Sequence, residues 1–531
     1  MTSPSSNSPA LGSSFSIQFL AATIPFITLF IALLTIAHHN ITIKLSQTKS
    51  LPPGPPGLPF LGNLSLILRP NLHHRLAHLS LTYGPIMRLR LGTKLWIVIS
   101  SPTIAKQIFT EKDLEFSNHE QPIAATVISY GGSNLVRCPY GPTWRMLRRV
   151  FVHELVNAKS LDAAAELRRG EMKRAVRGIW AKQGKSSSIN VGELGFEVSL
   201  NMLMTMLCGE EQSVKWREKG VEFRRVMMET VELLGRQNAS DYLPLLSWLD
   251  LQGIERGMKK RVAWMDRVYE EMIEERKRMR ECGAAGDEEG ESGKDLLSKL
   301  LKIRDGEDSR FKLSNIQLKG LIMDFLVGGT TGAWTTLEWL MAELIHRPDA
   351  YRRALNELDT VVGRKRAVEE SDIPHLPYLR CLIKETLRLH SVIPLLVPRV
   401  PVRPITIAGH LIPAGARVVT NVWAIQNNPE VWDKPHEFRP ERFLPGGEGE
   451  SIAGGFGFFP FGAGRRKCAG LPLAERMVPF VAATLLHLFE WRVTDGEGTD
   501  LKGRSGVTLT KEKALVAVAV ARFPACREMY E

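Results

Sequence analysis

The feature that most constrains this chain is a glycine-rich loop that presents one cysteine, Phe461-Gly462-Ala463-Gly464-Arg465-Arg466-Lys467-Cys468-Ala469-Gly470. Glycines let the backbone turn through positive φ and approach a flat ligand closely. The cations before Cys468 favour the thiolate that a metal needs. The helix predicted from Leu471 would point its N-terminal amides at the sulfur. The loop therefore predicts a cysteine that binds a flat metal cofactor; an ordinary buried cysteine in a turn is the alternative.

Composition narrows the class of protein. The 531 residues, of which 44% are hydrophobic, are enough to bury a large core. The six cysteines show no C-x-x-C spacing, which argues against a disulfide scaffold and a zinc ribbon and suits a reducing compartment. The net charge of +12 comes without aromatic interleaving or a nucleic-acid motif. We therefore expect no nucleic-acid partner, and we assign the charge to an anionic membrane surface or an acidic redox partner.

The N-terminus predicts a membrane anchor. No charged side chain precedes Lys44, and residues 15–37 are almost wholly apolar, which suits a spanning helix of ~20 residues. A cleaved signal peptide is the alternative, but its basic n-region and shorter apolar core are missing. Because Lys44 and Lys49 follow the apolar segment, the positive-inside rule places the rest of the chain in the cytosol. The predicted parts are a short lumenal N-terminus (1–14), a transmembrane anchor (15–37), a basic and Pro-rich hinge (38–60) and a cytosolic domain (61–531).

The cytosolic domain reads as mainly α-helical with small β-sheets. Residues 89–100 predict two short strands around a Gly-Thr turn. Residues 116–139 predict a loop, and residues 161–302 predict mostly helix. The Gly- and Glu-rich segment 282–293 predicts a surface loop, not a domain boundary.

A long helix is predicted from a cap at Ser314 through Glu338. It contains Gly328, Gly329 and Gly332, and a glycine inside a helix costs about 1 kcal/mol relative to alanine. A packing or functional reason is therefore expected. A phosphate-binding glycine loop fits poorly, because no lysine follows and no strand clearly precedes.

Two further motifs place polar side chains on one face of a helix. Trp144 and Arg148 are four residues apart after Pro142, so an indole N–H and a guanidinium can bind one carboxylate together. A surface helix with a partly buried tryptophan is the alternative. In the amphipathic helix predicted over residues 378–390, Glu385 and Arg388 are three residues apart and can pair, which alone is commonplace.

Together these features resemble the plant microsomal cytochromes P450 of the A-type group, which are haem-thiolate monooxygenases. The motifs occur in the family's order: a Pro-rich hinge, W-x-x-x-R, E-x-x-R, F-x-P-E-R-F at 438–443 and F-x-x-G-x-R-x-C-x-G at 461–470. Residues 140–148 and 325–330 look closest to members that oxidise sesquiterpenes. The resemblance implies the cytochrome P450 fold with a single N-terminal transmembrane helix, and it makes 61–531 the haem-thiolate catalytic domain.

The resemblance also implies a role for each motif. Cys468 is the axial ligand of the iron of haem b. The cofactor-binding residues are Trp144, Arg148, Arg399, Phe461, Arg466, Cys468 and Gly470. A buried structural triad consists of Glu385, Arg388 and Arg442. The substrate pocket is lined by Val127, Ile128, Leu326, Gly329, Val392, Ile393, Leu396 and Val397. The glycines of the long helix would leave room for dioxygen and substrate.

At one place the chain departs from the family. Members usually carry an acid followed by an alcohol just after the glycine pair, and these two side chains pass protons to the site of oxygen activation. Thr331 and Gly332 stand in those places here. Proton delivery is then left to Thr330, Thr331, Thr335, ordered water or a substrate hydroxyl.

Three functions follow from the resemblance. The first is a monooxygenase that oxidises a small apolar plant metabolite, a terpenoid, with O₂ and with electrons from NADPH-cytochrome P450 reductase. The reductase would dock on a basic face formed by Arg145, Arg149, Arg465 and Lys467. The second is a haem-thiolate enzyme of non-insertive chemistry, such as rearrangement, dehydration or desaturation, and the third is a non-catalytic haem scaffold. The predicted location is the endoplasmic reticulum membrane, with one span and the catalytic domain in the cytosol.

Overall fold

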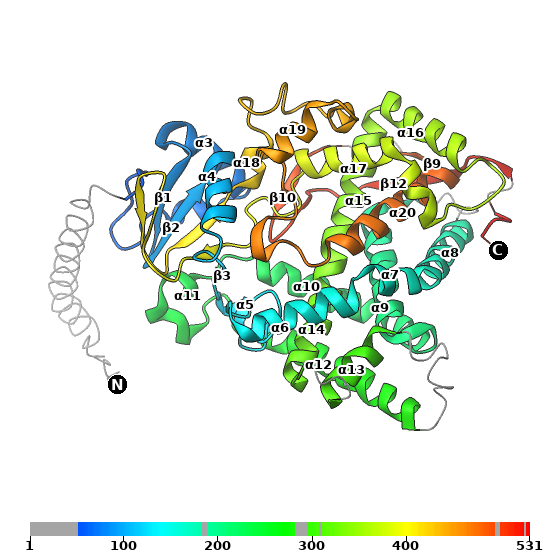
Figure 1. Cartoon of the computed structure of the whole chain (residues 1–531), viewed down its shortest axis with the longest axis horizontal. Helices are drawn as coiled ribbons and strands as arrows, with labels where there is room; N and C mark the ends of the chain where they lie inside the picture. Colours follow the sequence, from blue (N-terminus) through cyan, green and yellow to red (C-terminus); the bar gives the residue numbers. More distant parts are fainter. Residues whose placement is uncertain are drawn as a thin grey trace, which may run out of the picture.

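The computed structural model describes residues 51–182, 188–281, 295–306, 311–493, 500–524 and 527–530. The predicted lumenal segment, the anchor and the first part of the hinge lie outside the described residues, as does the predicted surface loop 282–293. Figure 1 shows strands β1 and β2 at one side of the molecule and helices filling most of the remainder. The predicted mainly α-helical class is confirmed.

The helices have the following bounds: α2 Leu64–Ile67, α3 Leu72–Tyr83, α4 Pro102–Lys106, α5 Ile123–Ile128, α6 Pro142–Val150, α7 Ala158–Ala163, α8 Ala165–Lys182, α9 Val191–Glu218, α10 Gly220–Gly235, α11 Ala239–Tyr242, α12 Ile254–Glu281, α13 Leu296–Asp305, α14 Asn315–Met323, α15 Gly329–His346, α16 Pro348–Val361, α17 Pro377–Leu389, α18 Val422–Gln426, α19 Glu448–Gly454 and α20 Leu471–Leu488. The helical stretch predicted over 161–302 is therefore found in its described part.

A five-stranded sheet has the order β1-β2-β8-β5-β3. Its hairpin, β1 (Ile86–Leu91) and β2 (Lys94–Ile99), is the one that the sequence predicts, with Ile86 opposite Ile99. β2 pairs in parallel with β8 (Arg417–Thr420), which joins segments far apart in the chain. β5 (Arg399–Val400) then pairs with β3 (Asn118–His119).

The prediction of a plain loop over 116–139 is wrong in part, because this segment contains β3 and α5. β3 has only two residues and forms by pairing with β5, so it leaves no periodic pattern in the sequence. The smaller sheets pair β6 (Ile405–Ile407) with β7 (His410–Ile412), β10 (Gly503–Ser505) with β11 (Leu509–Lys511), and β12 (Val516–Ala521) with β4 (Ile189–Asn190) and β9 (Phe489–Arg492).

The long helix forms as predicted but is not regular. Ser314 caps α14 in a capping box with Gln317. After Met323 the chain makes one π-helical segment, Asp324–Gly328, and then continues as α15 to His346. A π-helical segment inside an α-helix often marks a functional position.

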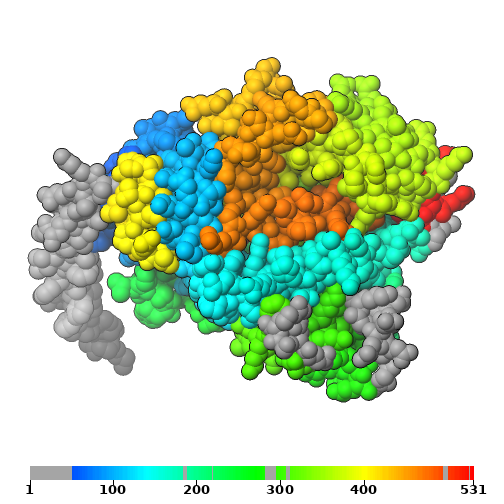
Figure 2. Space-filling model, viewed as in Figure 1, coloured from blue at the N-terminus to red at the C-terminus, as the bar shows by residue number. Residues whose placement is uncertain are grey.

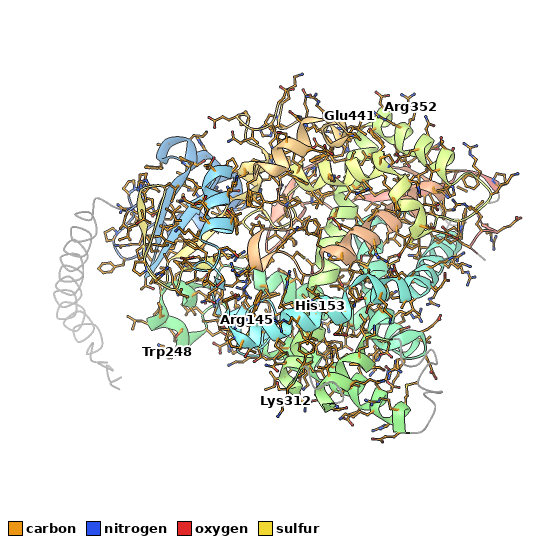
Figure 3. The ribbon with its side chains drawn as sticks, viewed as in Figure 1. Arg145, His153, Trp248, Lys312, Arg352 and Glu441 are labelled. Carbon is orange, nitrogen blue, oxygen red and sulfur yellow. The ribbon has the colours of Figure 1, made fainter. Side chains whose placement is uncertain are left out.

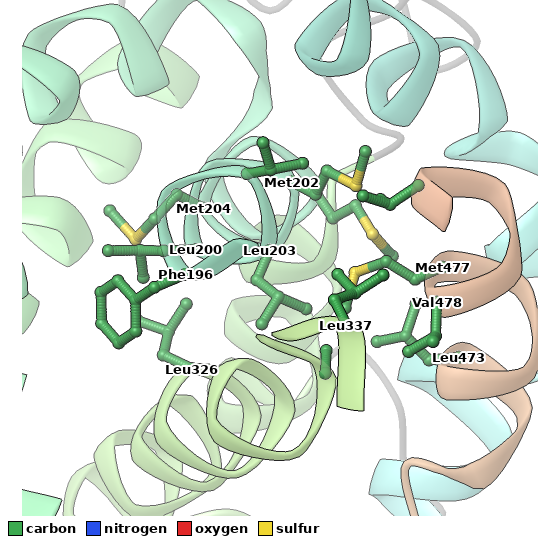
Figure 4. Packing of buried hydrophobic residues seen from close by; sticks show 14 of the residues in the cluster. Phe196, Leu200, Met202, Leu203, Met204, Leu326, Leu337, Leu473, Met477 and Val478 are labelled. Atoms are coloured by element: carbon green, nitrogen blue, oxygen red, sulfur yellow. The ribbon is translucent and has the colours of Figure 1, made fainter. Parts of the chain in front are cut away.

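α9 and α20 both pack against α15 in the largest core cluster (Figure 4). Leu203, Leu337 and Met477 are each at most 1% exposed there, and burying such a side chain contributes roughly 1.5–3 kcal/mol. Among the described residues, Val191–Arg217 and Leu471–Leu488 are long and apolar enough to cross a membrane. Because 78% and 72% of their apolar windows are buried inside the molecule, we interpret both as core helices.

Candidate functional site

The cysteine loop is closed by its own backbone. The Cys468 N–H donates to the Phe461 carbonyl at 3.0 Å, and Gly462 and Gly464 have φ values of 68° and 69°. A Cβ on Gly464 would lie 2.3 Å from an oxygen of Asp113, so no larger residue fits. Cys468 is exposed, whereas the other described cysteines are buried. The loop thus presents one accessible sulfur just before α20.

The electrostatics around this sulfur act in two directions. Burial by the surrounding protein raises the pKa of the Cys468 thiol. The N–H groups of Gly470 and Leu471 and the cations of Arg148 and Lys467 lower the pKa. The helix amides and part of the cation cluster therefore act as predicted, but the net shift is upward. A metal would have to displace the thiol proton on binding, as metals do with coordinating thiols.

Arg466 and Trp144 lie together on one side of the loop. The Arg466 guanidinium donates to the carbonyls of Ser117 at 2.7 Å, Cys138 at 2.6 Å and Leu135 at 3.2 Å. Its Cζ stands 4.5 Å from the centroid of the Trp144 ring. The Trp144 indole N–H donates to the Leu135 carbonyl at 3.2 Å. The two predicted cofactor-binding residues thus share one backbone oxygen.

Two more of the predicted cations differ in their partners. Arg399 is 4% exposed and donates to the carbonyls of Phe116 and Ala463, each at 3.1 Å. Arg148 is half-buried on α6 and makes no hydrogen bond or ion pair with any residue that the structure describes. The positive charge of Arg148 lowers the pKa of the Cys468 thiol, so the two groups are near enough to interact electrostatically.

These cations lie close together with little compensating charge. Burial lowers the pKa of Arg399 and of Arg466 to about 10, and for Arg466 the positive charges of Arg399 and Arg148 add to this effect. The nearby carboxylate is Asp113, 3.7 Å from Arg399. An anionic ligand would relieve this repulsion. An accessible sulfur beside an unpaired guanidinium and a cationic cluster fits haem, a flat metal cofactor with two carboxylates.

Two residues of this region escaped sequence reasoning. Asp113 accepts hydrogen bonds from the backbone N–H and the guanidinium of Arg465, both at 2.9 Å, and so ties the cysteine loop to the rest of the fold. His119 pairs with Arg399 across β3 and β5. Burial and the charges of Arg399, Arg466 and Arg137 lower the His119 pKa well below its ordinary value, so this ring is neutral. Neither residue lies in a recognisable motif.

The structure brings the three residues of the predicted triad together. Glu385 and Arg388 are fully buried and form two hydrogen bonds, at 2.7 and 2.8 Å. Arg442 reaches the same carboxylate at 3.4 Å, and the backbone N–H of Arg439 donates to it at 2.8 Å. The Glu385 carboxylate therefore has partners on both of its oxygens.

The glycines of the long helix divide into two kinds. Gly328 and Gly332, four residues apart and so on one face, would place a Cβ in open space. A Cβ on Gly329 would lie 2.8 Å from Leu203 of α9. Gly329 therefore permits close packing of α15 against α9, and its place in the substrate pocket stays a prediction. Leu326 is fully buried and lies beside Phe196 of α9 in the core (Figure 4).

The three threonines proposed for proton delivery all hydrogen-bond to their own helix. Thr330 donates to the Leu326 carbonyl, Thr331 to the Val327 carbonyl and Thr335 to the Thr331 carbonyl, at 2.7, 2.7 and 2.9 Å. Each hydroxyl oxygen still has a lone pair that can accept a proton or a hydrogen bond. Thr331 and Thr335 are four residues apart, so they share one face of α15.

The remaining predicted pocket residues come from two places. Val127 and Ile128 end α5; Ile128 is buried, while Val127 lines an open surface groove of about 370 Å³ together with side chains of α12 and α14. Val392, Ile393, Leu396 and Val397 lie between α17 and β5. Leu396 has a φ of 50°, an uncommon conformation for a leucine.

The comparisons with known proteins agree with this geometry. Residues 52–518 match the family model described as Cytochrome P450. A flavonoid 3'-monooxygenase of Crocosmia x crocosmiiflora is 37% identical over 492 residues, which cover 90% of this chain and 94% of that protein. The trimethyltridecatetraene synthase of Zea mays is 38% identical over 499 residues and covers 90% of each chain. A zebra fish cytochrome P450 structure with progesterone superposes with a TM-score of 0.70 at 25% identity, covering 85% of this chain and 99% of that one.

Proposed function

The chain belongs to the cytochrome P450 family and is a cytochrome P450 monooxygenase, and we propose that it oxidises a small apolar terpenoid with O₂ and with electrons from NADPH-cytochrome P450 reductase. One observation carries the proposal: the glycine loop presents an accessible Cys468 sulfur two residues after Arg466, beside a cluster of cations with little compensating charge. The family implies haem, and this arrangement suits a haem whose iron binds the sulfur and whose propionates meet the cations.

Each side of the cofactor has its own residues. When bound, haem supplies the activation of oxygen, which a thiolate ligand favours. Cys468 would ligate the iron, and Arg148, Arg399 and Arg466 would bind and orient its carboxylates. The single N–H of Trp144 already donates to the Leu135 carbonyl, so Trp144 would support Arg466 and would not bind a carboxylate itself. Gly328 and Gly332, where a Cβ would meet nothing within 4 Å, would leave space for substrate.

The substrate class rests on the apolar character of the proposed pocket. Ile128, Val392, Ile393, Leu396 and Val397 offer hydrocarbon surface and no fixed charge. A pocket lined in this way discriminates by shape and by apolar contact area. One relative is named for a product that is a hydrocarbon by its printed name, and others are named for flavonoids. We favour a terpenoid because the apolar side chains offer a flavonoid's hydroxyl groups no partner.

Reconstitution tests this function. The full chain, purified with haem and combined with the reductase in vesicles, is assayed against terpenes and flavonoids with and without NADPH. We expect NADPH- and reductase-dependent oxidation of a terpene. Oxidation of flavonoids alone would overturn the substrate class, and turnover without NADPH would overturn the monooxygenase mechanism. If the protein binds haem but oxidises none of these compounds, the result would support the third function, a non-catalytic haem scaffold.

The proposed reductase surface is the basic face around the cysteine loop. Arg145, Arg149 and Lys467 are exposed and form no ion pair within the part of the chain that the structure describes, whereas Arg465 pairs with Asp113. Arg145 lies on α6, on the face seen in Figure 3, and Figure 2 shows the loop and α20 reaching that face. Unpaired surface cations favour encounter with an acidic partner.

A specific observation keeps a second function open: Gly332 provides no hydroxyl where the family has an alcohol, which suits non-insertive chemistry. We predict that Thr331→Asp with Gly332→Thr raises coupled turnover by at least roughly tenfold, because one positioned proton donor contributes a hundredfold or more. The threonine fits, since a Cβ at 332 meets nothing within 4 Å. Product formed per NADPH consumed measures the effect.

Thr331→Asp with Gly332→Ala is the matched control, since it adds the acid and a Cβ but no hydroxyl. If the Asp/Thr variant loses the native product instead, the missing relay serves the native chemistry and the non-insertive function is supported.

We also propose that an exposed apolar patch helps to hold the domain on the membrane. The patch consists of Leu245, Leu246, Trp248, Leu249 and Leu251 with Leu58, Phe60 and Leu61. Its two parts meet at the β1–β2 turn, where the Leu61 carbonyl accepts from Gly92 and the Tyr242 carbonyl accepts from Thr93. The patch includes the end of the predicted hinge that follows the anchor, and Trp248 points away from the molecule in Figure 3. Apolar patches of this kind mark interaction sites.

Replacing Leu245, Trp248 and Leu251 by serine is expected to weaken binding of residues 51–531 to lipid vesicles by at least roughly tenfold. These side chains are 90%, 80% and 60% exposed, and burying each in lipid is worth roughly 1.5–3 kcal/mol. Co-sedimentation with vesicles measures the effect. Leu81→Ser, at an 83% exposed leucine of α3, is the control and should change nothing. Equal binding by the triple variant and the unchanged domain would contradict this role.

A further inference from the structure

Asp324 is an acidic residue within the apolar stretch 321–327 of the long helix. It is the first residue of the π-helical segment Asp324–Gly328. Its two oxygens are used by the loop before α6: the Leu135 N–H donates at 2.7 Å and the Asn134 side-chain amide donates at 2.6 Å. Asn134 is 4% exposed. The carboxylate has no salt bridge within the described ranges, so its partners there are the neutral donors of the loop.

Gly320, one turn earlier on the same face, allows the loop to approach. A Cβ at this position would lie 3.1 Å from the Cβ and 3.2 Å from the Cα of Asn134. Contacts that short would require the loop to move by a few tenths of an ångström. The loop therefore docks on α14 at two successive turns, once by backbone proximity and once by hydrogen bonds.

The same loop holds the cofactor-binding side chains from its other side. The Leu135 carbonyl accepts from the Trp144 indole and from the Arg466 guanidinium, each at 3.2 Å. The Leu135 N–H is bound to Asp324. Leu135 thus connects the carboxylate of the long helix to Trp144 and to one member of the cationic cluster, Arg466, which stands two residues before Cys468.

The electrostatics of Asp324 fit this arrangement. Burial raises the pKa of its carboxyl to about 7, while the N–H groups of Leu135 and Val136, the Asn134 amide and the Arg137 charge lower it. The loop donors are thus what favours the ionised form in this enclosed place. A carboxylate hydrogen-bonded in this way makes stronger bonds than a neutral acceptor.

We propose that Asp324 is a positioning residue that fixes the loop 134–138 and, through the Leu135 carbonyl, holds Trp144 against the Arg466 guanidinium and so places Arg466 for the haem propionates. The proposal rests on the haem site of the proposed function. It adds that the long helix and the residues that would hold the haem carboxylates form one mechanical unit. Loss of the Asp324 carboxylate should therefore loosen haem while leaving the iron ligand in place.

The test measures the rate at which the protein loses haem and does not measure enzyme turnover. Full-length holoenzyme in detergent is mixed with excess apoglobin, and the rate of haem transfer is measured by absorbance. Asp324→Asn puts an amide N–H opposite a donor of the loop. We expect it to speed haem loss by at least roughly tenfold, the effect of losing one hydrogen bond to a charged group. Amide exchange at Leu135 should accelerate as well, and the ferrous–CO spectrum should keep its thiolate form.

A reciprocal exchange separates positioning from general destabilisation. In Asn134→Asp with Asp324→Asn, the new amide accepts from Leu135 and donates to the new carboxylate, which also keeps the 2.9 Å bond from the Arg137 N–H. Haem loss should return to within about threefold of the natural rate. Asp266→Asn, on α12 beside Tyr130 and Lys319, is the matched control and should not alter haem loss.

The proposal would be overturned if Asp324→Asn changed neither the rate of haem loss nor the rate of amide hydrogen exchange at Leu135. It would also be overturned if the double variant Asn134→Asp with Asp324→Asn lost haem as fast as Asp324→Asn alone. If Asp324→Asn does not accumulate as folded protein, Asn134→Ala, which removes one donor, decides by a roughly threefold or larger increase or by none. Because none of these measurements uses substrate, they are independent of whether the chain oxidises a terpene.

Discussion

Replacing Cys468 with serine is expected to reduce NADPH-dependent turnover by at least roughly a hundredfold and to remove the thiolate form of the ferrous–CO spectrum. Changes to residues that only support a metal ligand already cost 10–100-fold in affinity or activity, and this change removes the ligand itself. The serine hydroxyl is far less acidic than a thiol, so it does not replace the thiolate at neutral pH. Haem content and the spectrum of purified protein measure the effect.

Cys381→Ala is the matched control. Cys381 is buried in a small core cluster with Trp432 and Phe443 and is not part of the cysteine loop. This variant should lose some stability and keep the thiolate spectrum. If Cys468→Ser kept that spectrum and Cys381→Ala lost it, the assignment of the iron ligand would be wrong.

The parts of this site that could be predicted from the sequence are those that depend on residues close together in the chain. The cysteine loop depends on glycines at 462 and 464, where φ is positive, and such positions are visible as residue types. The cap at Ser314 and the hairpin around Gly92 are likewise set by neighbours in the chain. The Glu385 pair could be predicted because three-residue spacing places both side chains on one helix face.

What could not be predicted depends on which distant segment arrives at a given position. Gly328 and Gly329 are adjacent and chemically identical, yet one faces open space and the other faces Leu203, because α9 crosses at that point. The Leu135 carbonyl accepts hydrogen bonds from Trp144 and Arg466. Every residue has a backbone carbonyl, so residue types do not indicate which carbonyl will be used. Asp324 did leave a signal, since a single acid inside an apolar helical run needs partners when it is enclosed.

Glu385→Gln is expected to destabilise the folded protein by about 3–5 kcal/mol, which is the usual effect of removing one partner of a buried ion pair. Stability totals of roughly 5–15 kcal/mol make this a large loss. The neutral amide cannot accept from Arg388, Arg442 and the Arg439 N–H together, and it leaves two buried guanidinium groups without their shared charge. Urea denaturation followed by tryptophan fluorescence measures the change.

The loss of stability in Glu385→Gln should also weaken haem binding, because hydrogen bonds connect the triad to the segment before the cysteine loop. Arg388 also donates to the Gln426 carbonyl at 2.8 Å, and the Gln426 side chain accepts from the Phe459 N–H at 3.2 Å, just before the cysteine loop. Glu385→Gln protein that still folds should therefore retain less haem. The matched control is Asp349→Asn, which removes an ion pair with Arg352 at the same three-residue spacing, but with side chains 94% and 73% exposed. That pair is worth at most about 1 kcal/mol, so equal small losses in the two variants would contradict a structural role for the triad.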